Sequence, residues 1–165
     1  MITQYDKLKI SVDMNKETIK RQKLGLRLSQ AGMLSKVFAM QSFVNNNCKI
    51  TPEQFTVLNV LMDNNGLYQR QISTITLKDR ANITRIINIL LDKGYVRKVV
   101  DTTSRKIHKI YITENGKMIV ESVMPEILKI WGTMSENIEE QEMENFILTL
   151  EKIKNNLTDK TILQL

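Results

Sequence analysis

The chain has 165 residues, with 24 Lys and Arg against 18 Asp and Glu and a formal net charge of +6. This length suits one domain with helical extensions. A single Cys excludes a disulfide framework and a multi-Cys zinc site, and a single His leaves little for metal or nucleophilic chemistry. No apolar run approaches the ~20 residues of a membrane span, and the N-terminus lacks a secretory signal. We therefore expect a cytoplasmic protein with no membrane contact, catalytic site, cofactor or metal.

The basic charge is concentrated in the middle of the chain. Residues 66–113 carry 10 basic and 3 acidic side chains (10 − 3 = +7), whereas residues 114–165 carry 5 basic and 10 acidic ones (5 − 10 = −5). A basic block within an ordered, apolar-patterned segment favours a polyanionic partner. The alternative is a solvated surface with a chance excess of charge.

Two helices are predicted in the first third of the chain. Residues 16–44 have apolar side chains at helical spacing, while residues 1–14 predict only an arm or a short helix. Thr51, Pro52 and Gln54 then predict a helix start with a capping box. This second helix is expected to bury one set of side chains, namely Phe55, Leu58, Val60, Leu61 and Met62.

A pair of helices joined by a short turn follows. Residues 70–76 predict a short helix with Ile72 and Ile75 directed inward, and residues 80–93 predict a second helix that ends at Gly94. The apolar stripe of this second helix consists of Ile83, Ile86, Ile87 and Leu90. This layout is that of a helix-turn-helix.

After Gly94 the apolar pattern changes from a helical to an alternating period. Residues 95–100 and 106–112 predict a β-hairpin, and a hairpin directly after a recognition helix is the wing of a winged helix. From Thr113 a long helix is predicted, which Pro125 should kink or divide. A last helix, with one apolar face, is expected from about Glu139 to Leu157.

In this order of elements, residues 16–157 resemble the MarR family of bacterial transcriptional regulators. The resemblance is carried by Thr51-Pro52-Glu53-Gln54-Phe55, Ile83-Thr84-Arg85, Leu90, Lys93-Gly94-Tyr95-Val96-Arg97, Arg105-Lys106, Ile112-Thr113 and Gly116. The sequence departs from the family in its wing, where Ser104 and Lys106 stand in place of Asp-x-Arg and Asp101 lies nearby. The helix-turn-helix connection also lacks the usual Gly.

The resemblance implies a mainly α fold with a small β-hairpin wing. Residues 51–113 would form a winged helix-turn-helix that binds double-stranded DNA, and residues 1–50 and 114–165 a helical dimerisation region. An obligate homodimer would read a pseudo-palindrome, with repression as the family habit. The terminal helices are also more apolar than a thin winged domain needs, which points to a partner helix. The alternative is that these helices close on one another within one chain.

The DNA contacts are expected on the second helix of the pair, which would enter the major groove by its N-terminal half. Arg pairs bidentately with guanine and Asn with adenine. The candidate base readers are therefore Arg80, Asn82 and Arg85, with Thr84 as a base or phosphate contact and a phosphate clamp or ion pair as the other role open to Arg85. The predicted backbone contacts are Ser73, Thr74 and Lys78, together with Arg105 and Lys106 at the minor groove or its phosphates.

Family members often release DNA when a small aromatic or anionic effector binds. The side chains compatible with such a pocket are Met33, Phe38, Phe55, Met62, Met124 and Trp131, although this pattern is more often plain core. The one thiol, Cys48, stands beside Lys49, whose charge should lower the thiol pKa slightly. An unremarkable loop thiol is the alternative.

Other functions compete with a specific regulator. The sequence has no Gly-rich phosphate loop, no metal-ligand spacing and no Ser/His/Asp set, so we expect no enzymatic activity. A winged helix that binds nucleic acid or packages DNA without sequence preference is the main alternative. A winged helix used only for protein contact is another, but it would leave the basic segment unexplained.

Overall fold

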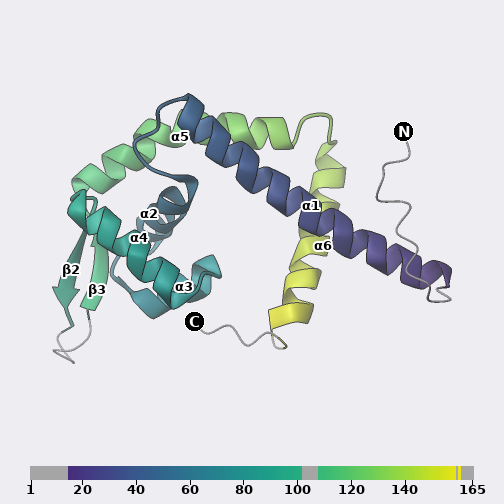
Figure 1. The fold of residues 1–165 in the computed structure, drawn as a ribbon, viewed down its shortest axis with the longest axis horizontal. Helices are drawn as coiled ribbons and strands as arrows, with labels where there is room; N and C mark the ends of the chain where they lie inside the picture. Colours follow the sequence, from purple (N-terminus) through teal and green to yellow (C-terminus); the bar gives the residue numbers. More distant parts are fainter. Residues whose placement is uncertain (1–14, 102–107, 159, 161–165) are drawn as a thin grey trace. The chain divides into compact units, whose positions relative to one another are not determined.

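A computed structural model describes residues 15–101, 108–158 and 160 of the chain. The predicted N-terminal arm and the basic tip of the wing lie outside these residues. The chain divides into two compact units, Met1–Val37 and Phe38–Leu165. Helix α1 (Lys16–Asn45) is one continuous helix (Figure 1). Phe43, near its end, is buried and belongs to the second unit.

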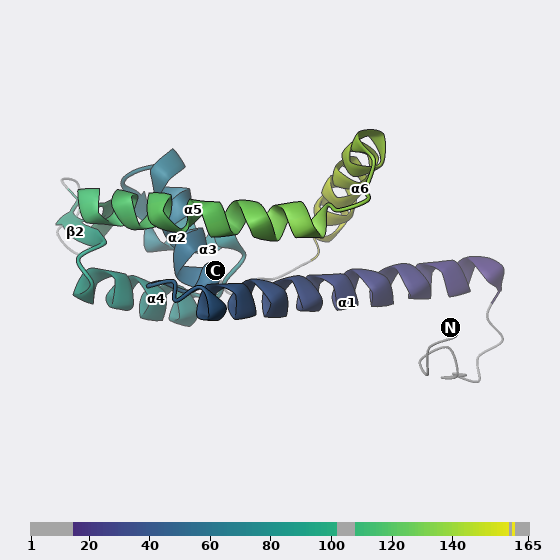
Figure 2. The same ribbon diagram turned by 90° about the horizontal axis from the view of Figure 1, so that it is seen from above.

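The second unit is a winged helix with additional helices, as the sequence predicts. Its elements in chain order are α2 (Pro52–Asp63), β1 (Leu67–Tyr68), α3 (Gln69–Thr76), α4 (Arg80–Asp92), β2 (Val96–Val100), β3 (His108–Ile112), α5 (Glu114–Met134) and α6 (Glu140–Thr158). Seen from above, α2 lies between α4 and α5 (Figure 2). The core therefore gathers around α2.

The start of α2 is the predicted capping box. The backbone N–H of Gln54 donates to the Thr51 hydroxyl, and the Gln54 amide oxygen accepts from the Thr51 backbone N–H, both at 3.2 Å. Phe55, Leu58 and Leu61 are buried as expected, and so is Val57, which the prediction missed. The prediction that Met62 is buried is wrong, because this side chain is 39% exposed.

Helices α3 and α4 form the predicted helix-turn-helix, and α4 buries the whole predicted stripe of Ile and Leu. Ile72 of α3 is fully buried, but Ile75 is 52% exposed, so its inward placement is wrong. The turn needs a left-handed residue, and the chain supplies Leu77 (φ +52°) where a Gly would be unstrained. The turn therefore forms without a Gly, with a leucine in the strained left-handed conformation.

The wing consists of β2 and β3, paired antiparallel with Val96 opposite Ile112 and Val100 opposite His108. The sheet has a third strand that the sequence pattern did not predict. This two-residue strand, β1, pairs with β3 through Leu67 and Ile110, so the strand order is β1-β3-β2. The strand follows Gly66, whose positive φ of +86° lets the chain turn against the Tyr111 ring.

Helix α5 runs through Pro125 without a break, so the proline does not divide it. Helix α6 follows, and none of its residues is buried. Its exposed apolar side chains are Met143, Phe146, Ile147, Leu148 and Leu157. Across the described residues, no helix combines the length and the apolar character that crossing a membrane requires.

The first turn of α5 packs tightly on the base of the wing, against Tyr95 just before β2 and Ile112 at the end of β3. The Thr113 hydroxyl caps the helix by accepting from the Gly116 N–H at 3.1 Å, and it donates to the Gly94 carbonyl at 2.7 Å. A Cβ on Gly116 would lie 2.1 Å from the Tyr95 carbonyl oxygen and 2.7 Å from Ile112 Cγ1. A side chain here would thus force backbone atoms apart.

We therefore expect Gly116→Ala to lower the free energy of unfolding by about 1–3 kcal/mol, because α5 must shift away from the wing. Gly132→Ala, in the same helix, is the matched control, because its Cβ meets nothing within 4 Å. This control should gain about 0.5–1 kcal/mol from the higher helix propensity of Ala. Urea unfolding measures both values, and equal effects of the two substitutions would contradict the packing argument.

Candidate nucleic-acid interface

The inner face of α4 packs in the core, and its outer face carries polar side chains. Arg80, Thr84 and Arg85 are exposed there, and Asn82 is half-buried. The helix is capped by Asp79, whose carboxylate accepts from the Asn82 backbone N–H at 2.8 Å. The cap and the buried stripe together fix which side chains point outward.

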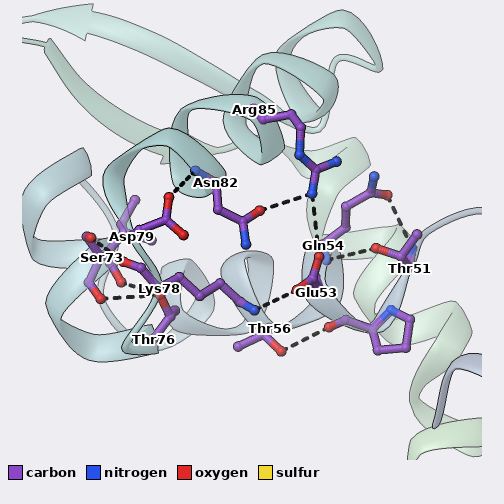
Figure 3. A network of polar contacts seen from close by, with 12 residues as sticks. Thr51, Glu53, Gln54, Thr56, Ser73, Thr76, Lys78, Asp79, Asn82 and Arg85 are labelled. Atoms are coloured by element: carbon purple, nitrogen blue, oxygen red, sulfur yellow. Dashed lines mark hydrogen bonds and ion pairs between the residues drawn. The ribbon is translucent and has the colours of Figure 1, made fainter. Parts of the chain in front are cut away.

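Two predicted base readers contact each other. Nη2 of Arg85 donates to Oδ1 of Asn82 at 3.0 Å, as expected for residues one turn apart on a helix. The same guanidinium nitrogen lies 3.6 Å from Glu53 Oε2 on α2. Arg85 is thus both a helix-surface donor and a partner of an ion pair (Figure 3).

Glu53 also binds the predicted phosphate contact Lys78, with the ammonium 2.8 Å from Oε1. The Lys78 side chain is only 21% exposed, whereas that of Arg85 is 61% exposed. One carboxylate therefore joins α2, the α3–α4 turn and α4 (Figure 3). Sequence reasoning missed this role of Glu53 and placed it only in the helix start.

Ser73 is a correction to the predicted contacts. Its side chain is fully buried, and its hydroxyl donates to the Lys78 carbonyl oxygen. The Lys78 N–H in turn donates to the Ser73 carbonyl at 3.2 Å. Ser73 therefore fixes the turn between the helices and has no surface to offer a phosphate.

The other predicted contacts on these two helices are exposed. Thr74 donates to the Arg70 carbonyl within α3, and the Thr84 hydroxyl lies 3.4 Å from the Gln69 amide oxygen. Arg80 and Arg70 line a cleft of about 310 Å³ where the two helices begin. A cleft with two guanidinium groups favours an anion such as a phosphate. The predicted wing contacts Arg105 and Lys106 lie outside the described residues.

The base of the wing holds a buried acid. Asp101 is 6% exposed, accepts from the Tyr68 hydroxyl at 2.6 Å and lies 3.5 Å from the Lys109 ammonium. The hydrogen bond to Asp101, followed by burial, raises the pKa of Tyr68. The pKa of Lys109 is raised first by the charge of an ionised Tyr68 and then by Asp101. These contacts tie β1 to the hairpin below its tip.

The thiol of Cys48 is less acidic than the sequence predicts. Burial, and then the negative charge of Glu126, raise its pKa, so the expected effect of Lys49 is wrong. A raised pKa disfavours the reactive thiolate. Within the described residues, no group of three or more His, Cys, Asp or Glu side chains comes together in a way that could hold a metal ion.

An open hollow of about 670 Å³ lies along α3 and β1, within the size range of small-molecule sites. Its lining residues are Leu67, Tyr68, Arg70, Gln71, Thr74 and Ile75. None belongs to the apolar set that the sequence suggested for an effector pocket. Two members of that set, Phe55 and Met124, belong to the core or pack against it.

Residues 49–107 match the family model of the MarR family. The chain is 30% identical over 95 residues to the uncharacterised HTH-type transcriptional regulator YybA of Bacillus subtilis, a match that spans 56% of this chain and 62% of YybA. The chain thus covers less than two thirds of this relative.

Solved structures share the fold at low identity. A mutant MarR from E. coli complexed with operator DNA matches with a TM-score of 0.72 and 17% identity, over 79% of this chain and 93% of that one. Bordetella bronchiseptica BpsR, whose DNA binding is regulated by 6-hydroxynicotinic acid, matches with a TM-score of 0.73 and 21% identity, over 80% of this chain and 98% of that one. Residues 49–107 therefore resemble the MarR family in sequence, and the described part of the chain shares the fold of these two solved structures.

Proposed function

We propose that this protein is a sequence-specific transcriptional repressor that binds a pseudo-palindromic operator as a homodimer. The observation that carries the proposal is that Arg80, Asn82, Thr84 and Arg85 lie outside the buried stripe of α4, on a helix that is capped and packed on the core. Arg and Asn are the side chains that read guanine and adenine edges. The MarR complex with operator DNA supports DNA as the ligand of this fold.

The contacts divide by chemistry into base readers and backbone contacts. Arg80, Asn82 and Arg85 read bases, and Thr84 contacts a base or a phosphate. Thr74 and Lys78 contact the phosphates beside the groove, while Arg105 and Lys106 of the wing reach the minor groove or its phosphates. Ser73 is not part of this set.

The homodimer is supported by apolar surface that one chain leaves exposed. Phe146, Ile147 and Leu148 of α6 are each more than half exposed, and so are Leu128 and Trp131 of α5. Exposed apolar area of this kind marks an interface with another chain. A second copy with two-fold symmetry would also present two α4 helices, which a pseudo-palindrome requires.

Release by a small aromatic or anionic effector completes the proposal. It is supported by BpsR, which shares the fold and responds to 6-hydroxynicotinic acid. The hollow beside α3 has a suitable volume and one guanidinium, that of Arg70.

The experiment is to let the purified protein select fragments from sheared genomic DNA at low and at physiological salt, and to sequence what it retains. A specific dimer enriches a pseudo-palindrome with half-site centres about one helical turn apart. Uniform binding that disappears at physiological salt would instead identify the alternative, a winged helix that binds or packages nucleic acid without sequence preference.

Arg85→Ala should weaken binding to the selected operator by about tenfold and relax the preference at one base position, because a bidentate contact is lost. Lys106→Ala is the contrasting variant. It should weaken operator and random DNA alike and reduce the salt slope by about one. Fluorescence anisotropy titrations on both duplexes give these values, and equal losses on both duplexes for Arg85→Ala would refute its base-reading role.

Ile147→Lys should dissociate the homodimer, because it places a charge in the apolar face of α6. Asn145→Lys, on the opposite face of the same helix, adds the same charge and should leave the dimer intact. Sedimentation equilibrium should show twice the mass of one chain for the wild type and the control, and a dissociation constant raised by about tenfold or more for Ile147→Lys. A monomeric wild type would contradict the dimer.

A further inference from the structure

We propose that Glu53 is a positioning residue that sets how strongly α4 discriminates between DNA sequences. This inference rests on the proposed DNA-binding function. Glu53 lies in the first turn of α2, outside the helix-turn-helix itself, yet its carboxylate contacts two side chains of the candidate interface, Lys78 and Arg85 (Figure 3).

The two contacts of the carboxylate have different strengths. The pair with Lys78 is short, 2.8 Å, and the Lys78 side chain is only 21% exposed, so it holds the carboxylate in place. The other oxygen then faces the exposed guanidinium of Arg85 at 3.6 Å. Lys78 therefore anchors the carboxylate and Arg85 is the group that it directs.

Arg85 is held from two sides in the protein without DNA. Asn82 accepts from its Nη2 at 3.0 Å, and Glu53 lies on the same nitrogen from another helix. An Arg side chain has many rotamers, and ordering it on binding has an entropic cost. Because Arg85 is already ordered toward the Asn82 side of α4, its side chain loses less conformational entropy when it binds a base edge.

The negative charge of Glu53 also increases the preference for the operator over random DNA. Binding to any DNA sequence is driven by cations that neutralise phosphates. A carboxylate that engages Lys78 and faces Arg85 reduces the positive potential available to random DNA. Glu53 therefore weakens non-specific binding and favours specific binding, and the ratio of the two affinities is the quantity that it controls.

The test compares the operator duplex from the fragment selection with a random duplex of equal length. Glu53→Gln should lower the ratio of the two affinities by about fivefold, with tighter binding to the random duplex. Glu114→Gln is the matched control: Glu114 also lies in the first turn of a helix and pairs with a lysine, Lys117, at 2.8 Å. The control removes the same charge and should leave the ratio unchanged.

Two further variants separate positioning from charge and from folding. Glu53→Asp keeps the charge but withdraws the carboxylate from Arg85, and it should also lower the ratio. In an Arg85→Ala background, Glu53→Gln should lower the ratio by less than it does in the wild-type background, because the positioned group is absent and only the effect of the charge remains. Thermal unfolding of each variant is followed in parallel, since a purely structural ion pair would lower the melting temperature without changing the ratio.

The outcomes distinguish this inference from the proposed function. A wild-type protein that prefers the operator, with the ratio unchanged in Glu53→Gln and Glu53→Asp, overturns the role of Glu53 alone. An equal fall in Glu114→Gln also overturns it, since net charge would then suffice. A wild-type protein with no preference between the duplexes overturns the proposed function and this inference together.

Discussion

Complete burial of one face of α4 is the constraint on which the candidate interface depends. Ile83, Ile86, Ile87 and Leu90 are all at most 1% exposed, and each such side chain contributes about 1.5–3 kcal/mol on burial. Rotating a 13-residue helix by one position would expose most of this stripe. Burial of the stripe therefore fixes the rotation of α4 about its own axis, and this rotation places Asn82 and Arg85 outside the core. Contacts such as the one from Glu53 then only choose among side-chain rotamers.

The sequence could predict those parts of the fold that depend on local chemistry. The capping box at Thr51, the left-handed Gly94 and the stripe of α4 are each determined by residues within one or two turns of one another. The predictions of burial for Met62 and Ile75 fail, because periodicity shows the centre of an apolar face and not its width. The two-residue strand β1 is too short to show an alternating sequence pattern. It is defined only by its pairing with the edge of β3.

The sequence could predict which residue types form the candidate site. It could not predict which of their side chains contact one another. An Arg and an Asn on a capped basic helix are visible in the sequence, whereas Glu53 and Lys78 are 25 residues apart and meet only after α2 and α3 pack. Ser73 illustrates the converse, because a hydroxyl at the start of the motif gives no sign that it is buried. The same limit applies to Cys48, whose pKa is raised first by burial and then by Glu126, far away in the chain.

The left-handed Leu77 has a further consequence for the turn between α3 and α4. A leucine in this conformation raises the free energy of the folded turn by about 1–2 kcal/mol relative to a right-handed one, and its 60% exposed side chain recovers little of this by packing. The turn therefore stores conformational strain. The two hydrogen bonds between Ser73 and Lys78 hold it in this conformation. A thermal fluctuation that breaks these hydrogen bonds releases the strain. The angle between α3 and α4 should therefore vary more than in a protein with glycine at this position.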